Sequence, residues 1–272
     1  MNFFSLIFLI LLSSLLSLVN SLIPANVRFN LLKYAKVSKE TYSFETSNLK
    51  IARVLDYDFV NYHNFKNNLG CLILDDKKDK NLIIGFKGTT KLEDWKYNFD
   101  FFQTKINDVY IHKGYYRILQ ENKMIEMLEK EIDKYDSDYN IHFCGHSAGG
   151  AKSLIVSYFL ADKFKNRNFK IFTYGSPRVG NINFVKKFNQ LNNVDHYRVS
   201  YNNDIVTAFP LLNYRHVDKS YRLKYLKNKK KIIDFGNYNK LTTFSLFKCN
   251  SVLDHNIDNY INFIDEYNKN LI

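Results

Sequence analysis

The order of apolar and polar residues predicts strands and helices along most of the chain. Residues 69–86 hold two apolar runs, LGCLIL and NLIIGF, separated by the polar stretch DDKKDK, and this pattern predicts a β-hairpin. Residues 23–41, which include Pro24 near their start, and residues 117–134 have the apolar spacing of amphipathic helices. The first half of the chain therefore contains both kinds of regular structure.

Strands and helices alternate most regularly in the middle of the sequence. Short apolar runs at 139–144, 169–174 and 195–200 predict strands, and longer runs at 147–164 and 181–190 predict helices. Strands that alternate with helices in this way form parallel sheets, because each helix returns the chain to the starting edge. The pattern predicts a mostly parallel central sheet with helices on both faces.

The last part of the chain is predicted to add a hairpin and a helix. Residues 216–235 read as two strands around the basic turn KNKKK, and residues 254–267 read as a helix. No change in composition separates two parts of the chain after its amino-terminal segment. We therefore expect one α/β domain over residues 22–272.

The amino-terminal segment has the pattern of a targeting sequence. Residues 3–19 form an uncharged apolar run, with Val19 and Ser21 as small residues before a cleavage point after Ser21. We expect a cleaved signal peptide over 1–21, with a retained membrane anchor as the alternative. Both readings send the remainder into the secretory pathway, so the protein is predicted to be secreted or to reside in that lumen.

Composition narrows the class of protein. The chain has 272 residues, of which 46% are hydrophobic, and this is enough to exclude a disordered or coiled-coil protein. A net charge of +12 suggests anionic surroundings. Three cysteines exclude a disulfide-dense scaffold and a four-cysteine zinc site. Whether Cys71, Cys144 and Cys249 form a disulfide is left open.

The candidate nucleophile is Ser147, in the G-x-S-x-G pentapeptide at 145–149. An apolar stretch precedes it and a helix-compatible run follows, which is the setting of a nucleophile elbow. The turn is so tight that side chains at Gly145 or Gly149 would collide with neighbouring backbone. The elbow would expose the Ser147 hydroxyl at a helix start, where N–H groups stabilise an oxyanion. A glycine-rich helix start capped by serine is the alternative.

A serine hydroxyl needs a base to take its proton, and the base needs an acid to orient it. In this type of fold the order along the chain is serine, acid, histidine. Asp204 follows a predicted strand and is the candidate acid, although it could instead be a turn residue. Of the downstream histidines, His196 lies within a predicted strand. The local sequence favours His255 over His216 as the base without excluding the latter.

The oxyanion hole requires two donors. One is the N–H of Ala148, which follows the nucleophile. The other would come from Thr89, in the turn after the strand that ends the first hairpin. That turn could also be a simple hairpin exit.

Six segments, in this order, resemble the class 3 (fungal-type) lipase family of α/β-hydrolases. They are GFKGTTKLEDW (85–95), IHKGYY (111–116), GHSAGGA (145–151), TYGSPRVGN (173–181), RVSYNNDIV (198–206) and CNSVLDHNIDNY (249–260). The resemblance implies an α/β-hydrolase fold, a catalytic triad of Ser147, Asp204 and His255, and oxyanion donors at Thr89 and Ala148. It implies a lid over residues 91–98, a lipid ester as substrate, and no metal or organic cofactor.

The sequence departs from the family at several positions. Lys87 replaces an arginine, Ala148 a leucine and Asn98 an aspartate, while Thr207-Ala208 replaces a proline-containing stretch after the acid.

The predicted lid is unusually polar. Leu92 and Trp95 share one helical face there and the other positions are polar, so we expect weak interfacial activation. Trp95 could instead pack in the core.

The function expected from the sequence is a secreted serine esterase, a lipase acting on acylglycerols. The alternatives are a phospholipase A1-like or soluble-ester hydrolase and, from another class, a non-catalytic lipid-binding protein. The basic hairpin could contact an anionic membrane, although such a charge run is more often a solvated surface. Nucleic-acid binding is not expected, and the protein is expected to be a monomer.

Overall fold

The structure is a computed structural model. It describes residues 23–43, 53–89, 101–217, 220–226, 230–236 and 251–270. The predicted signal peptide, the lid residues Leu92 and Trp95, Asn98 and Cys249 lie outside these residues. Among the helices that are described, none combines the length and apolar character needed to cross a bilayer.

Nine of the described strands form one sheet, in the order β1-β2-β3-β4-β7-β8-β9-β10-β11. Their bounds are β1 Arg53–Val54, β2 Tyr57–Phe65, β3 Leu69–Asp76, β4 Asn81–Phe86, β7 Asn140–His146, β8 Phe169–Tyr174, β9 Val194–Tyr201, β10 Ser220–Tyr225 and β11 Lys231–Gly236. The central run from β4 to β10 is parallel. The flanking pairs are antiparallel. The sheet thus has the parallel centre that the sequence predicts.

Both predicted hairpins are confirmed, as the pairs β3–β4 and β10–β11. Four strands were not predicted: β1, β2, β5 (Gln103–Ile106) and β6 (Val109–His112), of which the last two form a separate small sheet. None of the side chains of β2 is fully buried, and its sequence YDFVNYHNF mixes polar residues into both faces. A strand at this margin lacks the apolar alternation that sequence reasoning relies on.

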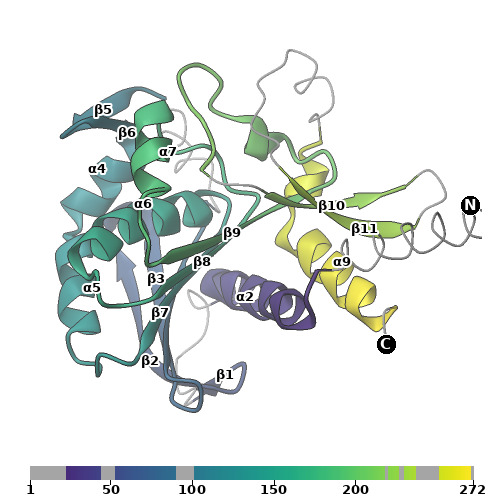
Figure 1. Ribbon diagram of the computed structural model, residues 1–272, viewed down its shortest axis with the longest axis horizontal. Helices are drawn as coiled ribbons and strands as arrows, with labels where there is room; N and C mark the ends of the chain where they lie inside the picture. The colour runs from purple at the N-terminus through teal and green to yellow at the C-terminus, as the bar shows by residue number, and fades with distance from the viewer. Residues whose placement is uncertain are drawn as a thin grey trace, which may run out of the picture.

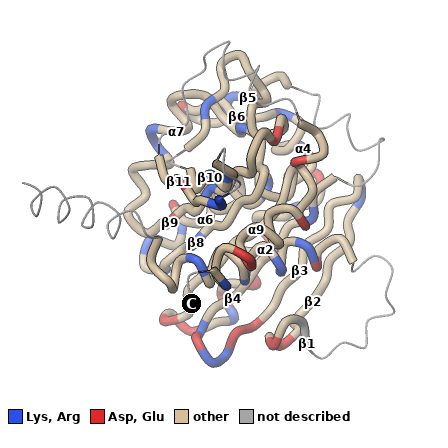
Figure 2. Tube along the Cα trace, turned by 90° about the vertical axis from the view of Figure 1, so that its right-hand side faces the viewer, with Lys and Arg blue, Asp and Glu red and all other residues tan. Residues whose placement is uncertain are grey.

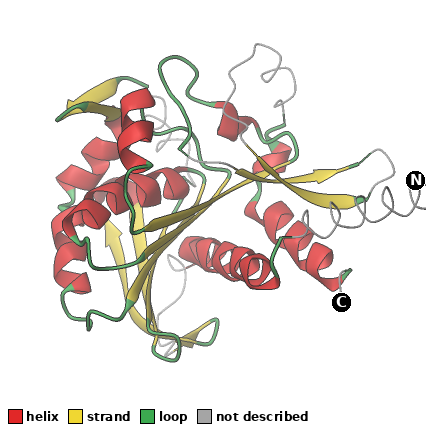
Figure 3. Cartoon of the chain, viewed as in Figure 1, coloured by secondary structure: helices red, strands yellow, loops and turns green. Residues whose placement is uncertain are grey.

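Helices cover both faces of the sheet, as Figures 1 and 3 show. The bounds are α2 Ala25–Ser43, α4 Lys113–Glu121, α5 Met124–Ile132, α6 Ala148–Lys163, α7 Ile182–Phe188 and α9 Ile257–Lys269. Helices α4 to α7 share one buried apolar cluster, and α2 and α9 share the other. Alternate residues of β3 enter the two clusters, because successive side chains of a strand point to opposite faces.

One predicted helix is two helices in the structure. Residues 117–134 were expected to be continuous, but the chain breaks between α4 and α5. Lys123 has a left-handed φ of 48°, and the Asn122 amide donates to the Ile118 carbonyl at 2.7 Å. The amide satisfies a carbonyl that a continuous helix would bond to backbone, so the first helix is capped and ends.

Cys71 and Cys144 are buried free thiols in adjacent parts of the sheet. Cys71 belongs to the cluster under α4 to α7 and Cys144 to the cluster under α2 and α9, so they lie on opposite faces. Burial raises the pKa of the Cys144 thiol to about 12, which keeps it protonated and unreactive.

Candidate active site

The carboxyl end of β7 carries Ser147 in a sharp turn. Ser147 has φ 58° and ψ −133°, and α6 begins at the next residue. A Cβ atom on Gly145 would lie 2.3 Å from the Gly149 carbonyl carbon, and one on Gly149 would lie 2.1 Å from the Phe86 oxygen. Both glycines are therefore required sterically, as the sequence predicted. A serine at positive φ is strained, and the surrounding backbone holds it there.

Ser147, Asp204 and His255 meet at this edge of the sheet. His255 Nε2 lies 2.8 Å from Ser147 Oγ, and His255 Nδ1 lies 2.9 Å from Asp204 Oδ2. Asp204 follows β9, and His255 ends a short 3-10 turn (Leu253–His255) before α9. Three segments far apart in the sequence thus form one hydrogen-bonded chain of serine, imidazole and carboxylate.

The other two downstream histidines have different partners. His216 Nε2 lies 2.7 Å from the Thr207 carbonyl oxygen, and His196 Nε2 lies 3.0 Å from Thr173 Oγ1. Burial lowers the pKa of both imidazoles, to about 3 for His196. They are neutral structural residues, and of the three imidazoles it is that of His255, which the sequence favours, that lies within hydrogen-bond distance of Ser147 Oγ.

Asp204 is buried and fully hydrogen-bonded. Its Oδ1 accepts from the Val206 N–H at 2.9 Å, and its Oδ2 accepts from the Tyr260 hydroxyl at 2.5 Å as well as facing His255. Burial, and then the charge of Asp204, raise the pKa of Tyr260, so its hydroxyl stays a donor. Sequence reasoning missed Tyr260, which lies one turn of α9 beyond buried Ile257 and looks like a core aromatic residue.

The loop with Asp204 is tied directly to the loop with His255. The Ser251 N–H donates to the Asn203 carbonyl at 3.1 Å. The Asp254 carboxylate accepts from the Asn202 amide at 3.0 Å and from the Asn203 N–H at 3.1 Å. These bonds fix the spacing between acid and imidazole, because neither loop can move without breaking them.

The two predicted oxyanion donors lie on adjacent parts of the same edge. Ala148 is the first residue of α6, and Thr89 lies three residues beyond β4, the strand paired in parallel with β7. A Cβ atom on Gly88 would lie 2.8 Å from the His146 carbonyl oxygen, so this loop packs against the elbow. Lys87 is buried and donates to Asn68 Oδ1 at 2.9 Å.

A cavity of about 260 Å³ opens at Ser147 and His255. Its other lining residues are Phe101, Tyr115, Pro177, Ile205, Val206, Phe209, Pro210 and Val252. A second cavity of about 470 Å³ shares Phe101, Phe209 and Pro210 with it. Ser147 therefore faces a mostly apolar space that continues into a larger apolar groove.

Comparison with known proteins relates the middle of the chain to one family. The model of the family described as Lipase (class 3) matches residues 83–214, a span that includes Ser147 and Asp204. Over this stretch, the chain is similar to the class 3 lipases. The resemblance inferred from the six motifs is confirmed, and His255 lies beyond the matched span.

Two curated proteins are similar in sequence to parts of the chain. "Secreted mono- and diacylglycerol lipase 1" of Fusarium solani is 28% identical over 165 residues, 58% of this chain and 48% of that protein. "Phospholipase A1-Igamma2, chloroplastic" of Arabidopsis thaliana is 37% identical over 101 residues, 35% of this chain and 18% of that protein. The matched stretches thus span less than half the length of these curated relatives.

A solved structure shows the same fold. The native Rhizomucor miehei lipase propeptide complex superposes with a TM-score of 0.73 at 19% identity, covering 86% of this chain and 80% of that one. The predicted α/β-hydrolase fold is confirmed.

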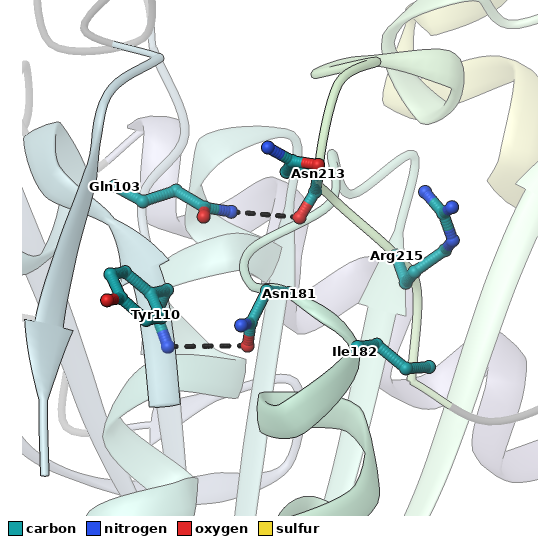
Figure 4. Close-up of a pocket in the computed structure, with 6 residues that line it drawn as sticks. All are labelled: Gln103, Tyr110, Asn181, Ile182, Asn213 and Arg215. Atoms are coloured by element: carbon teal, nitrogen blue, oxygen red, sulfur yellow. Dashed lines mark hydrogen bonds between the residues drawn. The ribbon is translucent and has the colours of Figure 1, made fainter. Parts of the chain in front are cut away.

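The structure also has a further pocket, which shares no lining residue with the cavity at Ser147 (Figure 4). It has about 330 Å³ and is lined by Gln103, Tyr110, Asn181, Ile182, Asn213 and Arg215. Gln103 Nε2 donates to the Asn213 carbonyl at 3.0 Å, and the Tyr110 N–H donates to Asn181 Oδ1 at 3.3 Å. These bonds join the small β5–β6 sheet to the loops beside it. In the part of the chain that the structure describes, no group of three His, Cys, Asp or Glu side chains is arranged to hold a metal ion.

Proposed function

We propose that this chain is a serine hydrolase of carboxylic esters, a lipase whose substrates are acylglycerols. The observation that carries the proposal is the hydrogen-bonded chain from Ser147 through His255 to Asp204, which opens into an apolar cavity. A nucleophile, a base and an orienting acid in this arrangement form the unit that acyl transfer needs.

In the proposed mechanism, Ser147 Oγ attacks the ester carbonyl carbon while His255 Nε2 takes its proton. Asp204 holds the proton on Nδ1, so that Nε2 is free to accept, and it stabilises the imidazolium that forms. The N–H groups of Ala148 and Thr89 stabilise the oxyanion. His255 then protonates the leaving alcohol, and water releases the acid from the acyl-enzyme.

Apolar surface around the cavity supports a lipid substrate. Phe102, Leu212 and Leu253 are 77%, 85% and 86% exposed. Leu212 and Phe102 line the groove that adjoins the catalytic cavity, and Leu253 is two residues from His255. Large apolar side chains exposed together are unusual on a soluble protein and suit contact with lipid. The name of the Fusarium relative supports acylglycerols in particular.

A phospholipase A1-like activity is the second candidate. The Arabidopsis relative carries that name, and the basic β10–β11 hairpin offered a contact for anionic headgroups. The Lys224 ammonium lies 2.7 Å from the Asp234 carboxylate, however, and Lys231 is ion-paired with Glu266. Figure 2 likewise shows basic and acidic residues interspersed along the chain. Because part of the hairpin's positive charge is neutralised by these ion pairs, it offers less attraction to anionic headgroups. We therefore prefer acylglycerols as the proposed substrates.

Secretion belongs to the same proposal. The apolar run at 3–19 and the word "Secreted" in the name of the Fusarium relative support a signal peptide that ends at Ser21. Amino-terminal sequencing of protein recovered from the culture medium tests it, and a mature protein that still begins at Met1 would contradict cleavage.

Ser147→Ala tests the mechanism. We expect the rate of ester hydrolysis to fall by about 10⁴–10⁶-fold and labelling by a fluorophosphonate to disappear, because the nucleophile is gone. Ser153→Ala is the matched control. Ser153 is a buried serine on α6 that donates to the Cys144 carbonyl at 2.9 Å, and its loss should leave labelling intact.

Substrate class is tested with the wild-type protein. Hydrolysis rates on acylglycerol emulsion, anionic phospholipid vesicles and soluble p-nitrophenyl esters separate the candidates. Activity confined to the soluble esters would contradict the proposed lipase activity. Undiminished hydrolysis by Ser147→Ala would contradict the proposed mechanism.

A further inference from the structure

His146, the residue before the candidate nucleophile, contacts the segment that carries His255. His146 Nε2 lies 2.7 Å from the His255 carbonyl oxygen, and His146 Nδ1 lies 2.9 Å from the Tyr42 hydroxyl of α2. The His146 ring is buried, and its centre is 4.6 Å from the centre of the His255 ring. Neither Tyr42 nor His146 has a role in the proton transfers described above.

The donors and acceptors in this contact can be assigned without ambiguity. A carbonyl oxygen only accepts, so His146 Nε2 carries the proton and donates to His255. In a neutral imidazole Nδ1 is then unprotonated, and it accepts from the Tyr42 hydroxyl. The Tyr42 oxygen in turn accepts a backbone hydrogen bond from Gly88, where a Cβ atom would lie only 2.0 Å from it. One continuous chain of hydrogen bonds runs from Gly88 to His255.

This chain connects the three segments that must act together. Gly88 precedes the oxyanion donor Thr89, and His146 precedes Ser147. The His255 carbonyl belongs to the residue whose imidazole is the base. Side chains in a small hydrogen-bonded network fix the positions of the backbones that they join. A displacement of about 1 Å in such a site is enough to slow a reaction about 100-fold.

We propose that Tyr42 and His146 are positioning residues, which hold the oxyanion loop, the nucleophile elbow and the backbone of His255 in register for ester hydrolysis. The inference rests on the proposed function. Tyr42 lies on α2, outside the span matched by the family model.

The charge state of His146 fits this role. Burial first, and then the neighbouring His255, lower the pKa of His146 well below its usual value, against the opposing effect of its bond to the His255 carbonyl. The other titratable rings that face it are Tyr42 and, at 6.0 Å between ring centres, Tyr260. A neutral His146 does not oppose the positive charge that His255 gains during the reaction.

The same helix and strand supply an internal control. The Tyr34 hydroxyl bonds to His142 Nδ1, as Tyr42 bonds to His146 Nδ1. Eight residues of helix span about 12 Å and four residues of strand span about 13 Å, so the two pairs form successive contacts between α2 and β7. Among the described residues, however, His142 Nε2 has no hydrogen-bond partner. The Tyr34 pair is thus a structural contact of matching chemistry that does not lead to the site.

The test compares Tyr42→Phe with Tyr34→Phe in the full-length protein. Kinetics on a soluble p-nitrophenyl ester and thermal unfolding are measured for both. We expect Tyr42→Phe to lower kcat about tenfold with KM changed less than about twofold, because the substrate still binds but the reacting groups are misplaced. Tyr34→Phe should keep kcat within about twofold, even where it lowers Tm as much.

His146 variants give a second and independent measurement. His146→Gln keeps one donor and one acceptor, and we expect kcat within about threefold of wild type. His146→Leu removes both, and we expect a loss of at least about tenfold and equally slowed fluorophosphonate labelling. If Tyr42→Phe does not fold, this pair decides the question.

Two results would overturn the inference: equal kcat losses in the two tyrosine variants, or equal kcat in His146→Gln and His146→Leu. A failure of the proposed function looks different, because the wild-type protein would then neither hydrolyse esters nor react with the fluorophosphonate.

Discussion

Two polar clusters occupy opposite edges of the same sheet, and their residue types are much alike. At the amino edge of the parallel strands, the Asp76 carboxylate accepts from Lys33 at 3.1 Å and from the Asn81 amide at 3.2 Å. At the carboxyl edge, Asp204 accepts from Tyr260 and faces His255. Each cluster has a carboxylate that is more than nine-tenths buried and is satisfied by nearby donors.

The two clusters differ in backbone conformation and in the groups that their hydrogen bonds connect. The amino-edge bonds join side chains of ordinary strand and helix positions, so they hold elements together. At the carboxyl edge, the series of hydrogen bonds that begins at Asp204 ends at the Ser147 hydroxyl. Ser147 has φ 58°, and its hydroxyl faces an apolar cavity. A list of polar residue types therefore does not identify a reactive site. A strained backbone that presents one group to a cavity is the better indication of such a site.

Asp204→Asn should have the largest effect among the variants that separate the two edges. Both positions around the carboxylate face donors, Val206 N–H on one side and Tyr260 and His255 on the other. An amide NH₂ must face a donor whichever way it turns: it either opposes the Val206 N–H or faces His255 Nδ1 and removes the preferred tautomer of His255. We expect kcat to fall about 10³–10⁴-fold in ester hydrolysis.

Asp76→Asn is the matched substitution at the amino edge. It removes a charge that pairs with Lys33, and we expect a loss of about 1–3 kcal/mol in the free energy of unfolding with kcat within about twofold. Similar kinetic losses in the two variants would show that the edges do not differ as argued.

Gly175→Ala should have the next largest effect. Gly175 has φ +57°, and a Cβ atom there would lie 2.7 Å from Asp204 Oδ2, 2.9 Å from the Tyr260 oxygen and 3.1 Å from His255 Cε1. The methyl group would move the carboxylate away from the imidazole, and we expect kcat to fall about 100-fold. The left-handed backbone adds a cost of about 1–2 kcal/mol to folding.

Gly85→Ala provides the control for a glycine in the interior of the sheet. Its Cβ atom would meet the Thr41 methyl at 3.0 Å and touches no group of the site. We expect lower stability, measured by urea unfolding, with kcat within about twofold. A Gly175→Ala enzyme with wild-type kcat would mean that the Asp204 position tolerates displacement.

The sequence predicted the parts of the site that depend on local structure. The elbow at Ser147 follows from glycine sterics and from the strand and helix on either side. The local sequence favours His255 over His216 without deciding between them, because the choice depends on contacts between segments that are far apart along the chain. Tyr260 was missed because burial of an aromatic residue on a helix stripe is the usual sign of a core. The Tyr42–His146 contact joins residues 104 positions apart, which no local pattern records.

His142→Gln should have the smallest effect of these substitutions, a change in the free energy of unfolding that is confined to acidic pH. Burial, and then Lys170 and Lys33, lower the pKa of His142 to about 3, compared with about 6.5 in the unfolded chain. Between these pH values the unfolded state binds a proton that the folded state does not, so stability falls as the pH falls. His142→Gln should reduce the slope of unfolding free energy against pH by at most about 1.4 kcal/mol per unit in this window. Urea unfolding from pH 4 to 7 measures the slope.

Activity provides the control for this variant. The kcat at pH 8 should stay within about twofold of wild type, because His142 lies near the amino end of β7, away from Ser147 at its carboxyl end. An unchanged slope would mean that His142 titrates normally in the folded protein, and a large loss of kcat would place the amino edge within the catalytic machinery.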